Sequence, residues 1–163
     1  MPRLDVLEAR LAALIAQTEP AERRTLAREL ARRLRERQRQ RIGAQVNPDG
    51  TPFEPRKSRL DGLRNGRLRA LIQWKNKGAI RRRMFARLAT ARYLKAESSA
   101  DSARVVFTEA ASRIATIHQF GLRDRVERRR DSPEVRYPAR RLLGLSEEDE
   151  QGLHELILMH LSK

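Results

Sequence analysis

The 163-residue sequence contains no cysteine and few aromatic residues. Without cysteine, the chain has no disulfides, no thiolate metal sites, no iron–sulfur clusters and no cysteine nucleophile. The aromatic residues are four Phe, two Tyr and one Trp, so a core must be mainly aliphatic. Hydrophobic residues make up 39% of the chain, which is enough to predict one folded domain of ordinary size.

Long apolar runs are also missing. No stretch approaches the roughly 18 to 20 consecutive apolar residues that a membrane-spanning helix needs. Asp5 and Glu8 lie where a secretory signal peptide requires an apolar segment. We therefore expect no membrane contact and a chain that is cytosolic when it is synthesised.

The common motifs of catalysis and cofactor binding are not found. His154 and Glu155 begin a zinc-protease motif, but Leu158 stands where its second histidine is required. Segment 62–67 lacks the Gly-Lys pair of a phosphate-binding loop, and no dinucleotide-binding glycine pattern or serine nucleophile elbow is present. The acids at 147–150 fit the start of a helix better than a catalytic pair. We predict no enzyme, no metal and no cofactor.

Positive charge is abundant and unevenly distributed. The chain has 36 Lys and Arg against 21 Asp and Glu, a formal charge of +15. Residues 43–95 carry 14 basic and 3 acidic side chains, whereas residues 144–163 carry one basic and five acidic ones. This asymmetry predicts separate surfaces for partners of opposite sign. Arginine far outnumbers lysine, which suits a nucleic-acid or protein interface but is equally explained by a GC-rich genome.

Arginine clusters define one functional hypothesis, a small basic nucleic-acid-binding protein. Non-specific binding to phosphates needs little more than a basic surface, although the scarcity of aromatics disfavours base-stacking modules. The run from Arg35 to Arg41 also fits a solvated helix face. The candidate contacts to DNA or to an acidic partner are Arg81, Arg82, Arg83, Arg87, Arg128, Arg129 and Arg130.

Helical spacing of leucines predicts a pair of N-terminal helices. The first covers residues 3–17, and the second runs from Thr18–Pro20 to about Ile42 with Gly43 as its stop. The second helix has an apolar line in its first half only. We therefore expect its arginine-rich second half to project into solvent or against a partner.

Residues 43–66 form a long segment that is rich in proline and glycine. Residues 47–50 are a strong turn signal, and Pro52 and Pro55 block regular structure around Phe53. Loops of more than about 15 residues are uncommon in compact domains, and contact with another subunit is one reason for them. The candidate partner loop consists of Asn47, Pro48, Asp49, Gly50, Pro52 and Phe53.

The rest of the chain alternates between short helices and extended segments. A helix or turn is expected at 68–74, a helix at 80–88, and a β-hairpin from strands 93–97 and 104–108. Helix 110–120 should end at Gly121 with three apolar side chains directed inward. These are Ile114, Ile117 and Phe120.

Two features complete the C-terminal part. Residues 122–137 predict an arginine-rich loop or irregular hairpin. Ser146 caps a helix over 146–161, whose three leading acids lie at the positive end of the helix dipole. Its expected buried stripe is Leu153, Leu156, Ile157 and Leu161.

The predicted fold class is α+β, with an N-terminal helical pair, a small antiparallel sheet, a C-terminal amphipathic helix and a long partner-binding loop. We divide the chain into N-terminal helices at 1–42, the loop at 43–66 and an α+β core at 67–163.

Two motifs resemble a known family. Residues 114–121 read IATIHQFG and residues 135–146 read VRYPARRLLGLS, separated by an arginine-rich interval and followed by a helix with an acidic start. Together they resemble the virion morphogenesis or tail-completion proteins of contractile-tailed temperate phages, including Mu-like ones. The loop Asn-Pro-Asp-Gly-Thr-Pro-Phe is similar too, although a Trp is usual in that family where Phe53 stands. The motif residues are Ile117, His118, Gln119, Phe120, Gly121, Pro138, Ala139, Arg140, Leu142, Leu143, Gly144 and Leu145.

The motifs make physical sense as architecture. Gly121 can provide a left-handed helix end that turns Phe120 back onto the core, and His118 and Gln119 can hydrogen-bond to the loop that follows. Gly144 permits a close backbone approach. Three leucines are expected to dock on the core, namely Leu142, Leu143 and Leu145.

The resemblance implies a structural protein of the tail end or head–tail junction that makes tails competent to join heads. We expect a homo-oligomeric ring, a hexamer to match the tail, formed through the 43–66 loop and the N-terminal helices. Implied partners are tail tube, tail terminator or neck and connector proteins, with non-specific contact to packaged DNA as a further possibility. The protein is expected in the bacterial host cytoplasm during assembly and then in the virion.

Overall fold

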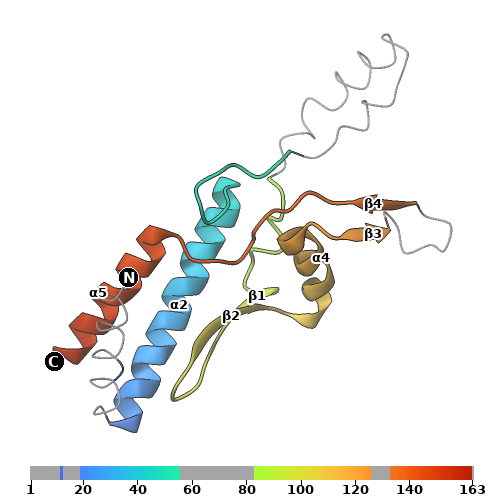
Figure 1. The fold of residues 1–163 in the computed structure, drawn as a ribbon. Helices are drawn as coiled ribbons and strands as arrows, with labels where there is room; N and C mark the ends of the chain where they lie inside the picture. The colour runs from blue at the N-terminus through green and yellow to red at the C-terminus, as the bar shows by residue number, and fades with distance from the viewer. Residues whose placement is uncertain (1–11, 13–18, 56–82, 126–132, 163) are drawn as a thin grey trace.

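The computed structural model describes residues 12, 19–55, 83–125 and 133–162, which form three helices and two small antiparallel sheets (Figure 1). The predicted α+β class is confirmed. The helix expected at 3–17 lies outside the described residues except for Ala12, as do segment 68–74 and the first part of 80–88. The elements are α2 (Pro20–Ala44), β1 (Leu94–Ser98), β2 (Ala103–Phe107), α4 (Glu109–Phe120), β3 (Arg123–Arg125), β4 (Glu134–Arg136) and α5 (Glu147–Leu161).

Helix α2 runs past its predicted end. Gly43 is helical, and the helix stops at Gln45, whose backbone is left-handed with φ 64°. The Gln45 N–H donates to the carbonyls of Arg41 and Ile42, which satisfies groups that the helix end would leave free. The Gln45 amide also pairs with the backbone of Met84, donating at 2.9 Å and accepting at 2.7 Å. These hydrogen bonds hold Gln45, a residue other than glycine, in the left-handed region.

One face of the second half of α2 is buried against the chain's own core, contrary to prediction. Gln38, Arg41 and Ile42 are all buried, and the helix contacts both the β1–β2 hairpin and α5 (Figure 1). The prediction was wrong because it assumed that the arginines in this half of the helix point into solvent. In the structure, the Arg35 Nε donates to the Leu94 carbonyl of β1 at 2.8 Å, and Arg41 turns inward.

Residues 83–93 form hydrogen-bonded turns rather than the predicted helix. The Ala89 N–H donates to the Phe85 carbonyl, and the Leu94 N–H donates to the Thr90 carbonyl. Phe85 has φ 61°, a conformation that a bulky side chain rarely adopts and that interrupts a regular helix. The turns lead directly into β1.

The β1–β2 hairpin follows the sequence prediction. Leu94 lies opposite Phe107 and Ser98 opposite Ala103, so the strands are antiparallel. A hydrogen bond from the Ser99 N–H to the Ser102 carbonyl closes the connecting loop. The alternation brings Leu94 to the core face of the sheet, where it is fully buried.

Helix α4 ends as predicted at Gly121, which is left-handed with φ 64°. Ile117 is buried, but Ile114 is 50% exposed and Phe120 is 67% exposed, so the expectation that both point inward is wrong. The buried face is instead built from small residues, Ala111 and Ala115, which let the helix backbone approach its neighbours closely.

After α4, the chain forms an irregular hairpin in the region predicted for one. Strands β3 and β4 are antiparallel, with Arg123 opposite Arg136 and Arg125 opposite Glu134. An ion pair of 2.5 Å between Arg113 of α4 and Asp124 of β3 ties the hairpin to the helix.

One small core joins these elements. It lies where the end of α2 meets residues 45–55, the turns before β1, helix α4 and the segment after β4. The core is aliphatic apart from a single phenylalanine, in line with the composition. Its buried members are Ile42, Phe53, Ala89, Leu94, Ala115 and Leu142.

Helix α5 begins as predicted but is less buried than predicted. Ser146 and Asp149 form a capping box, in which each side chain accepts from the other's backbone N–H at 3.2 Å. The apolar stripe of α5 is only half-buried, because within the described part of the chain the helix packs against α2 alone. None of the helices in the described residues is both long and apolar enough to cross a membrane.

Candidate functional site

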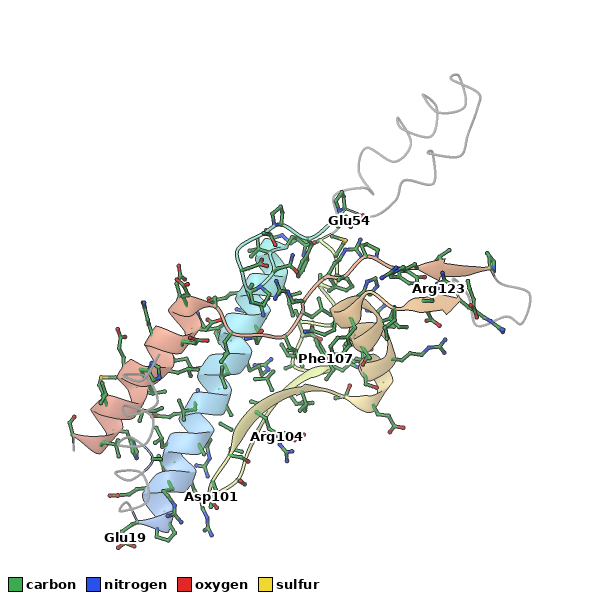
Figure 2. All side chains as sticks on the ribbon, viewed as in Figure 1. Glu19, Glu54, Asp101, Arg104, Phe107 and Arg123 are labelled. Atoms are coloured by element: carbon green, nitrogen blue, oxygen red, sulfur yellow. The ribbon has the colours of Figure 1, made fainter. Side chains whose placement is uncertain are left out.

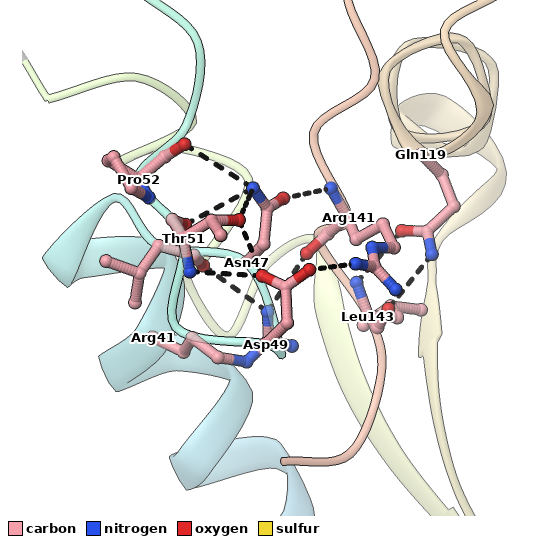
Figure 3. A network of polar contacts seen from close by, with 9 residues as sticks. Arg41, Asn47, Asp49, Thr51, Pro52, Gln119, Arg141 and Leu143 are labelled. Atoms are coloured by element: carbon pink, nitrogen blue, oxygen red, sulfur yellow. Dashed lines mark hydrogen bonds and ion pairs between the residues drawn. The ribbon is translucent and has the colours of Figure 1, made fainter.

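The two sequence motifs meet the turn of the predicted partner loop at the C-terminal end of α2 (Figure 3). We call this meeting point the motif junction. It brings together residues from three parts of the chain that are far apart in the sequence, namely 41–49, 119 and 140–143. They are Arg41, Asn47, Asp49, Gln119, Arg140, Arg141 and Leu143.

Arg41 is the central donor of the junction. Its buried guanidinium donates to the carbonyls of Arg141 at 2.9 Å, Leu142 at 3.1 Å and Gly144 at 3.2 Å. Gln38 accepts from Arg41 and donates its own amide to the Gly144 carbonyl at 2.7 Å. Burial lowers the pKa of Arg41 from its ordinary value, yet guanidinium stays charged in proteins. The second motif is thus fixed to α2 through its backbone.

Gln119 ties the first motif to the second. Its amide donates to the Leu143 carbonyl at 2.9 Å and accepts from the Leu143 N–H at 3.0 Å. The Gln119 amide thus forms with the Leu143 backbone the two bonds that a neighbouring β-strand would form with its own backbone. The His118 carbonyl accepts from the Arg140 N–H at 2.6 Å. His118 and Gln119 were expected to hydrogen-bond to the loop that follows α4; the bonds instead reach past the β3–β4 hairpin to Arg140 and Leu143.

Arg140 is buried and joins the second motif to the partner loop. Its Nε donates to the Glu54 carbonyl at 2.6 Å, and a terminal nitrogen donates to the Pro55 carbonyl at 3.2 Å. The other terminal nitrogen lies 3.1 Å from Nδ1 of His118. One arginine therefore connects three segments.

A series of ring contacts accompanies these bonds. The ring centroids of Phe53 and Phe85 lie 5.9 Å apart, those of Phe85 and His118 4.7 Å, and those of His118 and Tyr137 5.1 Å. All three pairs have the edge-to-face geometry that aromatic rings favour. The positive φ of Phe85 places its ring between two of these partners.

The turn at 47–50 is confirmed by a hydrogen bond from the Gly50 N–H to the Asn47 carbonyl. The Asn47 side chain accepts from the Arg141 N–H at 2.8 Å, and the Asp49 carboxylate binds the Arg141 guanidinium (Figure 3). Hydrogen bonds from the hydroxyl and N–H of Thr51, together with the nearby Arg141 charge, hold the pKa of Asp49 below its usual range. The turn is therefore anchored to the second motif.

Glycine is required at two places in the junction. A Cβ on Gly144, whose φ is 152°, would lie 2.6 Å from Cγ of Pro48. A Cβ on Gly121 would lie 3.0 Å from the backbone nitrogen of Ala139. The predicted close approach at Gly144 is confirmed, with Pro48 as the neighbour.

The model of the phage virion morphogenesis family matches residues 3–162. This chain belongs to the phage virion morphogenesis family. It is also 41% identical over 157 residues to tail completion protein S of Escherichia phage P2, which covers 96% of this chain and 95% of that protein. No solved structure matches the chain.

These matches confirm the family that the motifs indicated. They also confirm a structural, non-enzymatic phage tail protein with a role in tail completion and virion morphogenesis. Among the residues that the structure describes, no cluster of three or more acidic or histidine side chains could hold a metal ion.

Within this family member, the docking of the second motif is partly as expected. Leu142 is fully buried and Leu143 packs against the core, but Leu145 is 47% exposed. Pro138 is half-buried, and Ala139 is exposed apart from its contact with Gly121. Phe120 and Leu145 are therefore the two large motif residues that the fold leaves at the surface.

The predicted partner loop is folded onto its own chain where the structure describes it. Phe53 is 5% exposed in the core, and Asn47, Pro48 and Asp49 contact the second motif. Pro52 is exposed, and so is Gly50. Residues 56–66 of the loop lie outside the described part.

The candidate basic contacts are only partly placed. Arg83 and Arg87 are exposed, whereas Arg81, Arg82 and Arg128–Arg130 lie outside the described residues. The junction also contains donors that the sequence analysis missed. A signal for them existed, because Gln38, Arg41, Ile42 and Gln45 follow helical spacing and share one face of α2.

Proposed function

We propose that this virion morphogenesis protein completes tails by forming a ring at the tail end or in the neck, which makes the tail competent to join a head. The observation that carries the proposal is the similarity over nearly the whole chain to a protein named for tail completion. A match of this extent covers the motifs, the partner loop and both terminal regions together.

The motif junction supports a structural role. Its donors are side chains bound to backbone carbonyls, which fix the relative positions of α2, α4 and the segment before α5. A rigid body of this kind suits a component that is added to an assembly as a preformed unit. We propose six copies, to match the sixfold symmetry of a tail, because closed rings are the usual result of head-to-tail contacts between identical chains.

The proposed partners are the tail tube, the tail terminator or the neck and connector proteins. The chain would be present in the bacterial host cytoplasm during assembly and in the virion afterwards. The part of the partner loop at 56–66 and the N-terminal region 1–18 are the segments we propose for contact with a neighbour. Phe53 is not available for it, because its side chain is buried in the chain's own core.

Removing the gene from the phage tests the proposal. We expect lysates with separate full heads and separate tails in negative-stain electron microscopy. Purified protein added to such a lysate should restore joined particles, and native mass spectrometry of the purified chain should give its copy number. Normal joined virions from the deletion lysate would contradict the proposal, as would a protein that never co-purifies with tails.

Contact with DNA is a secondary proposal, motivated by the charge of +15 and by the exposure of Arg83 and Arg87. Binding through phosphates should weaken steeply as salt rises, because condensed counterions are released. A gel-shift titration at low and physiological salt measures this. Replacing both arginines by serine should reduce the salt dependence of binding, without preventing incorporation of the protein into particles.

A further inference from the structure

The large apolar side chains that the described part of the molecule exposes lie at two ends. Helix α5 is at one side of the molecule, and the β3–β4 hairpin beside α4 is at the other, with α2 and the β1–β2 hairpin between them (Figure 1). The first group belongs to α4, β3 and β4 and the segment joining α4 to β3, and consists of Ile114, Phe120, Leu122 and Val135. The second belongs to α5 and the residue before its cap, and consists of Leu145, Leu158 and Met159.

The hairpin end carries arginines without anionic partners. Arg123 and Arg136 lie directly opposite each other across the strands, both are exposed, and neither forms an ion pair with another described residue. Figure 2 shows Arg123 on the far side of the molecule from α5. Like charges at opposed positions repel each other, so an acidic group placed between them would relieve the repulsion. Because side chains alternate along a strand, Arg123 and Arg136 lie on one face of the hairpin and Val135 on the other. We call this end of the molecule, with its four exposed apolar side chains, the arginine end.

The α5 end has the opposite charge. Residues 142–162 contain five acids and no Lys or Arg. Asp149 and Glu148 are bound by Arg37, but three other acids are exposed and form no ion pair within the described residues. The helical spacing places them beside the exposed apolar residues, since Met159 lies one turn after Glu155, and Leu158 two turns after Glu150. The glutamate end consists of Glu147, Glu150, Glu155, Leu145, Leu158 and Met159.

We propose that the arginine end of one copy docks against the glutamate end of the next copy. The two surfaces are complementary in charge, and each combines exposed apolar side chains with charged ones, as protein interfaces do. Because they lie on opposite sides of the same molecule, the contact is head-to-tail, and repetition closes a ring or extends a filament. The proposal rests on the proposed ring and adds these two surfaces to the segments 1–18 and 56–66 that we propose above for contact with a neighbour.

A second copy fits the arginine end better than DNA does. Phosphates would pair with Arg123 and Arg136 but would leave the 67%-exposed Phe120 and the neighbouring Ile114 and Leu122 in water. An apolar patch of this kind beside charged groups is typical of a surface that binds protein. The glutamate end of the same chain provides the matching apolar residues with acidic neighbours.

Two complementary variants test the contact in the full-length protein. Phe120→Asp should disable the arginine end, and Met159→Lys should disable the glutamate end. Each variant alone should lose the multimer and give the mass of one chain in sedimentation analysis. An equimolar mixture should give a species of twice that mass, because each variant retains the surface that the other needs.

Matched controls make the same charge changes outside both ends. Ala86→Asp and Ala91→Lys are at exposed positions and should leave the multimer intact. Circular dichroism establishes that each variant is folded, which the exposure of Phe120 and Met159 favours.

The possible outcomes distinguish failure of the end-to-end contact from failure of the proposed ring. A multimer that survives both variants overturns the end-to-end contact but leaves the ring standing. Loss of the multimer in each variant, without a dimer in the mixture, also overturns the contact. That result is expected of an interface in which the same surface of two copies pairs with itself. A wild-type chain that stays monomeric, alone and with isolated tails, overturns the ring and the contact together.

Discussion

The motif junction and the docking of α5 both depend on arginines of α2, but they use them differently. In the junction, buried Arg41 donates to three backbone carbonyls of the second motif. At α5, half-exposed Arg37 pairs with carboxylates, Asp149 at 2.6 Å and Glu148 at 2.9 Å. The two sites lie about one helical turn apart on α2.

This difference distinguishes the charged side chains that stabilise the fold from those that remain available for other contacts. Removing a donor from the junction would leave buried carbonyls without a partner, and such a loss is far more costly than the loss of an exposed ion pair. The α5 contact has few such bonds and only a half-buried apolar stripe. We therefore expect the junction to dominate stability, and α5 to be the element that separates first.

Replacing Arg41 with methionine is the strongest test. The change fills similar space but leaves the carbonyls of Arg141 and Leu142 without their donor and the Gly144 carbonyl with Gln38 alone, so we expect a loss of about 3 kcal/mol or more. Urea unfolding measures it. Arg39→Met is the matched control, because Arg39 is exposed and, among the described residues, pairs with Glu36 alone; its effect should be much smaller than that of Arg41→Met. Equal effects of the two variants would contradict the comparison.

Gly144→Ala should have the next largest effect. The new Cβ would lie 2.6 Å from Pro48, in a backbone conformation unfavourable to side chains, so we expect a loss of about 1 to 3 kcal/mol. Pro48→Ala in the same chain should recover part of it, as a double-mutant cycle would show. Gly43→Ala, in open space within α2, should instead stabilise the protein by about 0.5 to 1 kcal/mol.

Asp149→Asn tests the weaker α5 contact. Burial raises the pKa of Asp149, but hydrogen bonds from Arg37 and Ser146 outweigh it, so the pKa lies below its usual value. The unfolded chain therefore binds the proton first as pH falls, and the stabilisation present above pH of about 4 is lost below it. We expect the variant to cost about 1 kcal/mol at neutral pH and less at pH 3, in urea unfolding.

Glu36→Gln is the comparison for that pH effect. The hydrogen bond from Arg39 is the main cause that lowers the pKa of Glu36 to about 2. The Glu36 side chain is 42% exposed, however, so solvent screens the pair and the variant should cost less than about 0.5 kcal/mol. A larger cost than that of Asp149→Asn would reverse the order that burial predicts.

Local signals in the sequence identified much of the fold. Gly121 and Ser146 were sufficient to predict one helix end and one helix start, because each acts on the backbone within a single turn. The β1–β2 hairpin was equally accessible from its alternation. The two family motifs identified the site, although not how they touch.

The sequence could not show which polar side chains are buried because they hydrogen-bond to backbone groups far along the chain. Arg41 resembles a solvated residue until the carbonyls of the second motif are placed around it. The same limit applies to Phe120 and Ile114, which look like core residues by spacing. The buried residues of α4 are Ala111, Ala115 and Ile117, and the fold leaves Ile114 and Phe120 exposed.

The bonds of Arg41 also set an order of events during synthesis. Its carbonyl partners follow it by 100, 101 and 103 residues, so α2 leaves the ribosome long before they exist. Ile42 and Phe53 must likewise wait for Leu142 to cover them. Contacts of such long range close late, which makes the core the final part of the nascent chain to form. A chain truncated before residue 144 would leave this centre open, so the core can close only after nearly the whole chain has been synthesised.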